Sequence, residues 1–146
     1  MINYYFEEVE EFTNDIPSNN SQWISKCIDL QGFNLSEISI IFCSDDYLLE
    51  INKTHLNHNY YTDIITFNYN EDKQIEGDLF ISIDRVKDNA KENGVEFMNE
   101  LQRVMIHGVL HLCGQNDKTE EEQAEMTRKE NLMLDELRTF HVKHNG

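Results

Sequence analysis

The chain has few of the features that mark multidomain, secreted or membrane proteins. Its 146 residues include one proline, Pro17, and no stretch rich in Gly, Ser or Pro that would separate two domains. No apolar run approaches the roughly 18 residues that a membrane-spanning helix needs. Residues 1–8 lack the basic and apolar regions of a signal peptide. We therefore expect one domain over residues 1–146, in the cytoplasm and without membrane contact.

Cysteine is also scarce. The three cysteines, Cys27, Cys43 and Cys113, are odd in number and form no CxxC motif. This pattern argues against a disulfide framework and predicts reduced thiols, as in cytosolic proteins.

Basic residues are few. Against 28 Asp and Glu stand 12 Lys and Arg, which gives a formal net charge of -16. Acidic clusters at residues 7–11 and 120–122 repel phosphate, so the composition argues against extended, non-specific binding of RNA or DNA. It leaves open a local basic groove, or recruitment by a protein partner. Most of the acidic runs are interpreted as solvated surface.

Hydrophobic periodicity predicts strands and helices in mixed order. Short β-branched or aromatic runs predict strands at residues 3–6, 37–43, 62–67 and 77–83. Helical patterns cover residues 84–93 and 96–113, with further helices after Ser44 and after the capping box Thr119-x-x-Glu122. The sequence thus predicts an α+β fold, with a small mixed four-stranded sheet covered by helices.

The first helix illustrates these predictions. Asn20-Ser21 is a pattern that can cap a helix start, and Gly32 stands where a C-terminal glycine is expected. Helical spacing then predicts an apolar face made of Trp23, Ile24, Cys27, Ile28 and Leu30.

Two histidines in an apolar stretch carry the strongest chemical signal. His107 and His111 are four residues apart, so on a helix their Cβ atoms lie on one face, roughly 5–6 Å apart. Gly114 allows the chain to turn, and Asp117 is the best third ligand by distance along the chain. Two histidines, one carboxylate and one water would form a tetrahedral zinc site with an exchangeable position. The same spacing also occurs in helices that bind no metal.

The remaining candidate ligands are interpreted as non-ligands. Cys113 would point away from the metal face of a continuing helix, so we expect it in the core. The other four histidines are expected to bind no metal: His55 and His58 in a polar loop, and His141 and His144 in the C-terminal tail.

Gly108 bears on the type of chemistry. Zinc peptidases with the His-Glu-x-x-His motif use the glutamate as general base, and Gly108 stands at that position. A peptidase would therefore lack its base, although a metal ion can still lower the pKa of bound water towards neutrality.

The segment 107–117, His-Gly-Val-Leu-His-Leu-Cys-Gly-Gln-Asn-Asp, resembles the signature of the YbeY family of bacterial ribosomal RNA maturation endoribonucleases, His-Gly-x-Leu-His-Leu-x-Gly-Tyr-Asp-His. Upstream, residues 51–53, 62–67 and 77–81 are similar to the family's Leu-Asn, Thr-Asp-Val-Leu-Ser-Phe and Gly-Asp-Ile segments. The order and spacing agree from about residue 48 to the end.

The resemblance implies a zincin-like metal helix and one Zn²⁺ per chain, with His107 and His111 as ligands. The family's third histidine falls on Asp117. A carboxylate in its place changes the net charge of the site from about +2 to about +1, which should make bound water less acidic. A set of two histidines and one carboxylate also suits iron or manganese.

Two further departures concern RNA contacts. Leu56 stands where the family usually has an arginine, and Gln115 where its signature has tyrosine. Lys53, His55 or His58 could replace the phosphate contact of that arginine. Arg85, Lys87 and Lys91 could line an RNA groove, although the lysines also fit the reading of exposed, solubilising side chains. Asp63 and Asp78 would either orient groups near the site or simply end strands.

The function implied by the resemblance is that of a metal-dependent, single-strand endoribonuclease. It would act in ribosomal RNA processing, at the 3′ end of 16S rRNA, and in ribosome quality control. The implied partners are precursor ribosomal RNA and the small ribosomal subunit or its proteins, with no DNA. Two alternatives remain: a non-catalytic ribosome-assembly factor with a structural metal, and a metallohydrolase acting on another substrate.

Overall fold

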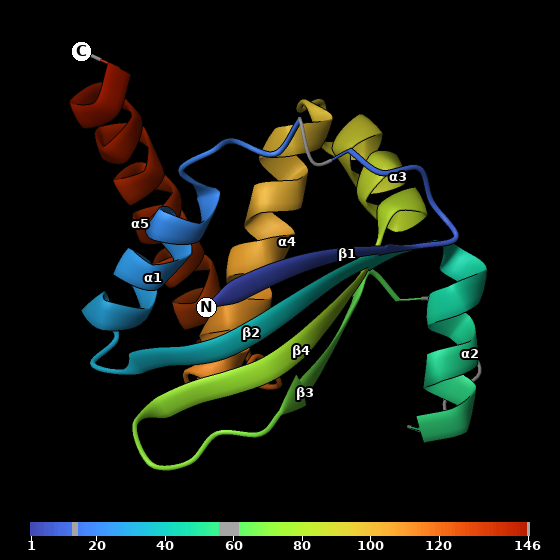
Figure 1. The fold of residues 1–146 in the computed structure, drawn as a ribbon, viewed down its shortest axis with the longest axis horizontal. Helices are drawn as coiled ribbons and strands as arrows, with labels where there is room; N and C mark the ends of the chain where they lie inside the picture. Colours follow the sequence, from blue (N-terminus) through green and yellow to red (C-terminus); the bar gives the residue numbers. More distant parts are fainter. Residues whose placement is uncertain (13–14, 56–61, 146) are drawn as a thin grey trace.

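Helices and strands alternate irregularly along the chain (Figure 1). The computed structural model describes residues 1–12, 15–55 and 62–145, with the backbone alone for residues 140–145. The elements in chain order are β1 (Ile2–Glu7), α1 (Asn20–Leu30), β2 (Asn34–Cys43), α2 (Asp45–His55), β3 (Ile64–Asn68), β4 (Gln74–Ser82), α3 (Ile83–Asn93), α4 (Phe97–Leu112) and α5 (Glu120–Asn145).

The four strands form one mixed sheet in the order β1-β2-β4-β3. β1 pairs with β2, and β2 with β4, in parallel, whereas β3 pairs antiparallel with β4 and forms one edge. The inner strand β2 has an almost continuous buried run from Ile38 to Cys43, as expected for a strand that is covered on both faces. The α+β prediction with a mixed four-stranded sheet is therefore confirmed.

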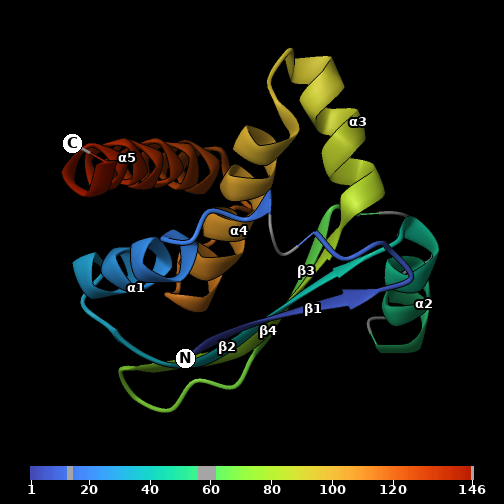
Figure 2. The same ribbon diagram turned by 45° about the horizontal axis from the view of Figure 1, so that its top comes forward.

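The helices cover the two faces unequally. α1, α4 and α5 lie together on one face of the sheet, where the main core forms around Trp23, Ile40, Leu79 and Met105 (Figure 2). α2 lies apart from them (Figure 1) and packs on the strands through a smaller cluster built on Cys43, Leu48 and Ile65.

The start of α1 differs from its prediction. The capping residue is Asn19, which forms no side-chain cap hydrogen bond, and Asn20 is already helical. The Asn20 side chain is buried and donates a hydrogen bond to Tyr4 Oη at 2.8 Å, so it serves the core instead of the helix end. The predicted apolar face is confirmed for four residues, which are buried: Trp23, Ile24, Cys27 and Ile28. It is wrong for Leu30, which is 49% exposed where the helix ends.

Other local signals are confirmed. The N–H of Tyr47 donates to Ser44 Oγ at the start of α2, and Gly94 ends α3 in the left-handed conformation. Because the main core joins residues from Ile16 to Leu137, we propose that residues 1–146 form one domain. Within the described ranges, none of the helices combines the length and apolar character that a membrane span requires.

Candidate metal centre

Helix α4 carries the two histidines on its partly exposed side. Its other side is buried against the sheet through Leu101, Val104 and Met105. Gly108 is also buried, and a Cβ atom there would lie 2.7 Å from Ile64 Cδ1. The absence of a side chain at residue 108 thus lets α4 approach the sheet closely, which brings its histidines next to β3.

The end of α4 turns the chain back towards the histidines. Gly114 has φ +94, a left-handed conformation that glycine adopts without steric cost. The N–H of Gln115 closes the turn by donating to Leu110 O at 3.0 Å. The predicted capping box follows, because Thr119 and Glu122 exchange two hydrogen bonds of 3.0 Å. Asp117 is therefore held in a short loop between two fixed helix ends.

Three ligand atoms meet at this loop. His107 Nε2 and His111 Nε2 are 3.0 Å apart, and Asp117 Oδ2 lies 3.3 Å from the first and 3.2 Å from the second. Tetrahedral ligands about 2.0–2.2 Å from a zinc ion lie roughly 3.3–3.6 Å from one another. The triangle is close to that size, so these three side chains can hold one small divalent cation. The structure thus brings together the predicted ligand set.

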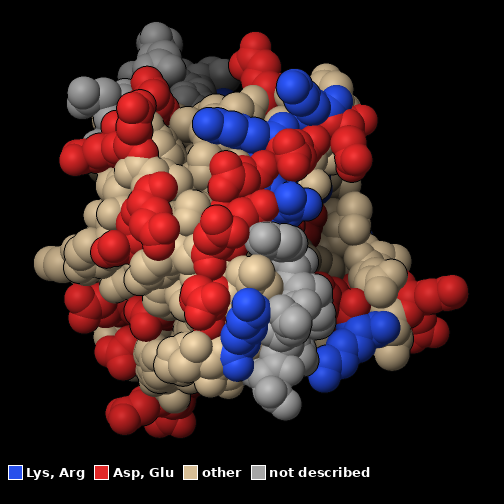
Figure 3. All heavy atoms as spheres, turned by 90° about the vertical axis from the view of Figure 1, so that its right-hand side faces the viewer, with Lys and Arg blue, Asp and Glu red and all other residues tan. Residues whose placement is uncertain are grey.

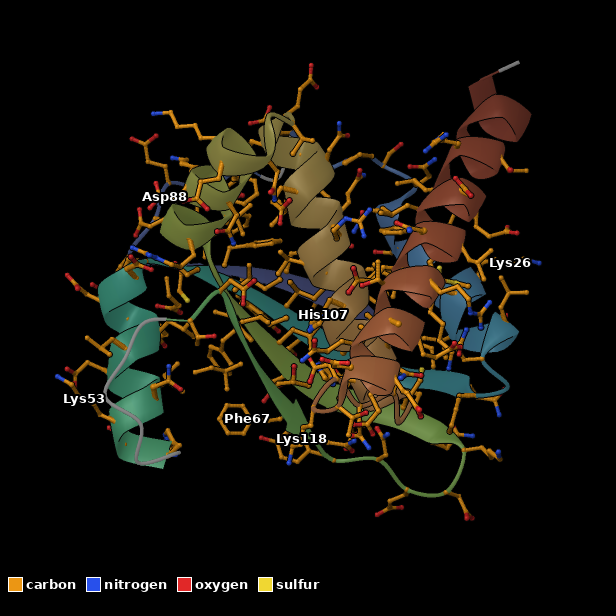
Figure 4. All side chains as sticks on the ribbon, turned by 180° about the vertical axis from the view of Figure 1, so that it is seen from behind. Lys26, Lys53, Phe67, Asp88, His107 and Lys118 are labelled. Carbon is orange, nitrogen blue, oxygen red and sulfur yellow. The ribbon has the colours of Figure 1, made fainter. Side chains whose placement is uncertain are left out.

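A cavity of about 500 Å³ opens beside the three side chains. Its opposite wall is the edge strand β3 and the residues before it, including Asp63, Ile64, Thr66 and Asn68, with Asn52 from α2. Figure 4 shows His107 between α5 and the strands, while Lys26 and Lys53 point outwards from α1 and α2. None of the described lining residues is Lys or Arg.

The electrostatics of the site favour a bound cation. Burial is the largest single influence on His107 and disfavours its charged form, but the hydrogen bond and charge of Glu130, with Asp117 and Asp63, outweigh it. The pKa of His107 is therefore raised. Burial raises the pKa of the Asp63 carboxyl, and His107 offsets part of that effect. A divalent ion would meet several acceptor groups in a partly desolvated place.

Two residues behind His107 were missed by sequence reasoning. They are Glu130 on α5 and Arg103 on α4. Glu130 accepts a hydrogen bond from His107 Nδ1 at 2.6 Å and forms an ion pair with Arg103 at 2.9 Å. A signal for Glu130 exists in the sequence. It lies at helical spacing between Met126 and Met133, so a carboxylate interrupts the apolar stripe of the last helix.

The predicted RNA-binding side chains lie elsewhere. Arg85 donates three hydrogen bonds to the Asp45 carboxylate, and Asp88 lies 3.7 Å away. Lys87 lines a different cavity, beside residues 9–12, and Lys91 is exposed on α3. Asp78 lies within β4, opposite Phe67. The RNA-binding role of the three basic residues stays a prediction.

Of the residues proposed to replace the phosphate contact of the family arginine, the structure describes Lys53 and His55. Lys53 is exposed on α2 and pairs with Glu50 at 3.7 Å. His55 ends α2, with its ring 6.0 Å from that of Phe67. Leu56 and His58 lie outside the described residues, as do the side chains of His141 and His144.

Cys113 is not among the three residues whose ligand atoms meet. It packs against the main core, and burial raises the pKa of its thiol to about 11. Burial likewise raises the pKa of Cys27 and Cys43 to about 12, so all three thiols stay protonated at neutral pH.

Comparisons with known proteins agree with this architecture. A family model described as Endoribonuclease YbeY matches residues 6–138. A protein of that name from Flavobacterium psychrophilum is 45% identical over 148 residues, which cover 99% of this chain and 100% of the relative. Another, from Bacteroides thetaiotaomicron, is 48% identical over 114 residues, or 78% and 83% of the two chains. The solution structure of a Thermotoga maritima protein shares the fold, with a TM-score of 0.66 at 23% identity and coverage of 95% and 93%.

Proposed function

Because the chain belongs to the YbeY endoribonuclease family, we propose that it is a metal-dependent endoribonuclease that cleaves single-stranded RNA during ribosomal RNA processing. The observation that carries the metal dependence is the triangle of His107, His111 and Asp117 at the wall of an open cavity. The proposed cofactor is one Zn²⁺ per chain, because nitrogen and carboxylate ligands in tetrahedral reach suit this ion.

The bound ion would supply Lewis-acid stabilisation of the negative charge that develops on a scissile phosphate. The protein contributes the position of that ion. His107 and His111 are fixed by the helix, and Asp117 by the loop between Gly114 and the capping box. Asp63 adds a carboxyl group to the same cavity, with a pKa raised by burial, which can hold or release a proton close to the substrate.

The edge strand supports binding of an unpaired strand. Asp63 O and Tyr69 N both form hydrogen bonds with the chain of β4, so the backbone groups of the alternate residues Ile64, Thr66 and Asn68 point away from β4. The N–H of Ile64 already donates to the Asp63 carboxyl. The outward-facing backbone groups of Thr66 and Asn68 can contact base edges or riboses that are not paired. A volume of about 500 Å³ is in the range of small-ligand sites, which suits individual nucleotides.

The acidic surface favours a role for a protein partner. Figure 3 shows acidic side chains over much of one face, with basic side chains scattered among them. With a net charge of -16, we propose that the protein reaches the RNA of the small ribosomal subunit by docking on a basic ribosomal protein in the cytoplasm. This also fits a second candidate function, that of a ribosome-assembly factor acting by binding, with the metal as a structural clip.

The proposed function is tested with an RNA that carries the 3′ end of 16S rRNA precursor, incubated with purified protein alone or with small ribosomal subunits. We expect cleavage in unpaired regions, loss of cleavage after chelation, and recovery with Zn²⁺. Duplex RNA and single-stranded DNA should remain intact. Cleavage that persists without metal would refute the mechanism. Rescue of ribosome maturation by a metal-free variant would favour the assembly factor. Metal-dependent hydrolysis of a peptide library would favour a metallohydrolase that acts on another substrate.

Metal removal should also lower stability. A ligand that binds the folded state at 100 times its Kd stabilises it by about 2.7 kcal/mol, which corresponds to several degrees in the melting temperature of a chain of this size. We therefore expect chelation to lower the melting temperature, and Zn²⁺ to restore it. The measurement is thermal unfolding with and without chelator. The matched control is His111→Ala protein, whose melting temperature should not respond to either reagent.

Replacement of Asp117 separates charge from geometry. Asp117→Asn keeps the size but removes the anionic ligand, so we expect Zn²⁺ affinity to fall by at least the roughly 10- to 100-fold that loss of a supporting residue costs. Asp117→His should still bind Zn²⁺ but should bind Mn²⁺ less well than the parent, because carboxylate suits Mn²⁺ and imidazole suits Zn²⁺. Competitive metal titration measures both. Equal affinity of Asp117→Asn and parent would exclude Asp117 as a ligand.

A further inference from the structure

A buried carboxylate lies directly behind one of the two histidines. Glu130 is 7% exposed, although it is charged and lies on α5, 23 residues from His107. Such a residue is almost never buried unless it is paired. Its two oxygens have different partners: Oε2 is 2.6 Å from His107 Nδ1, and Oε1 is 2.9 Å from Arg103 Nη1.

Arg103 fixes the orientation of this carboxylate. It lies one helical turn before His107 on α4, and its second terminal nitrogen donates to Asn131 Oδ1 at 2.9 Å. A guanidinium group can only donate and stays charged in proteins. Glu130 therefore stays in place as an acceptor, with one oxygen committed to Arg103 and the other to His107.

The hydrogen bond determines which nitrogen of His107 is free. A carboxylate only accepts, so the proton of neutral His107 must reside on Nδ1. Its Nε2, the atom that faces Asp117 and His111, then carries the lone pair that a metal needs. By contrast, His111 Nδ1 forms no hydrogen bond to any residue that the structure describes. The two histidines are thus held unequally.

From this geometry we propose that Glu130 is a positioning residue for the metal centre, which with Arg103 sets the tautomer and the ring orientation of His107. The inference concerns how this chain prepares its metal site, and it rests on the proposed function only in taking His107 as a ligand. Carboxylates that accept a hydrogen bond from a metal-ligating histidine typically raise metal affinity about 10- to 100-fold.

The test uses the isosteric change Glu130→Gln. Because Arg103 can only donate, the carboxamide oxygen must turn to Arg103, which leaves the NH₂ group facing His107 Nδ1. His107 would then accept at Nδ1 and carry its proton on Nε2, where it blocks the metal. We expect the affinity for Co²⁺, measured by absorbance titration of the whole chain, to fall about 10- to 100-fold.

Two companion variants separate positioning from general damage. Arg103→Met in the Glu130→Gln background frees the carboxamide to rotate its oxygen towards His107, so part of the affinity should return. Glu100→Gln is the matched control, since Glu100 is 8% exposed and lines the same small cavity behind His107, but has no hydrogen bond to it. Its Co²⁺ affinity should equal that of the parent.

Ring ¹⁵N NMR of metal-free protein reads the tautomer directly and independently of activity. The parent should show His107 protonated on Nδ1, and Glu130→Gln should show it protonated on Nε2. An Nε2-protonated parent, or a folded Glu130→Gln protein with parental Co²⁺ affinity, would overturn the proposal. If the protein binds Co²⁺ as expected but cleaves no RNA, the proposed function fails while the role of Glu130 stands.

Discussion

His111→Ala is expected to abolish both metal binding and RNA cleavage. His111 Nε2 is one corner of the ligand triangle, and its side chain is only 26% exposed, on the side of α4 that faces the cavity. Two remaining ligands, His107 and Asp117, would leave the ion without the three protein ligands of a catalytic site. Elemental content should drop from about one ion per chain to near zero, with cleavage at the level of the chelated parent.

This variant is preferable to His107→Ala, because the latter would also remove one of the two partners of the buried Glu130 and so destabilise the protein. The control is His55→Ala, which removes an exposed imidazole from another helix and should leave the metal content unchanged. A His111→Ala protein that retains its ion would show that the metal is bound elsewhere. One that loses its ion but still cleaves would remove the metal from the mechanism.

Gly77→Ala is expected to have the largest effect on stability. An added Cβ atom would lie 2.5 Å from the backbone oxygen of Phe67 and 2.8 Å from Leu112 Cδ2. Phe67 belongs to β3, which pairs with β4 next to Gly77, so its carbonyl cannot move away without disturbing the sheet edge. We expect a loss of about 3 kcal/mol in the free energy of unfolding, at the upper end for overpacked sites.

Urea denaturation measures this loss, and Gly32→Ala is the matched control. At Gly32 a Cβ atom meets nothing within 4 Å, although φ is +84, so the cost there is backbone strain of roughly 1–2 kcal/mol. Gly77→Ala should also weaken metal binding, because Leu112 follows His111 directly, whereas Gly32→Ala should not. Equal stability of the two variants would show that the sheet edge adapts to the added methyl group.

The grouping of the three candidate metal ligands was predictable because its signals are local. His107 and His111 share a helix face through their spacing, Gly114 permits the turn, and the capping box at Thr119 begins the next helix within a few residues. Each of these features depends on neighbours in the chain, and together they return Asp117 to the histidines. The buried part of strand β2, residues 38–43, was likewise predictable from its local run of apolar residues.

The contacts that the sequence did not indicate are those of side chains whose partners are distant in the chain. Asn20 is a residue type that often caps helices, but its side chain donates a hydrogen bond to Tyr4 in the core. Arg85 belongs to a basic helix pattern, but it is held by Asp45, 40 residues away. A side chain's propensity states what it can do near its own backbone, whereas its actual partner depends on which elements pack together.

The sequence by itself determined the family, the strands and helices in outline, and the three candidate ligands that lie within one short segment. The tertiary structure alone decided the strand order β1-β2-β4-β3, the exposed edge of β3 as the wall of the cavity, and the pairing of Glu130 and Arg103 behind His107. The physical reason is the distance along the chain over which each interaction acts. Periodicity and capping act over a few residues, but the environment of a metal ligand is completed by helices and strands that meet only when the core is packed.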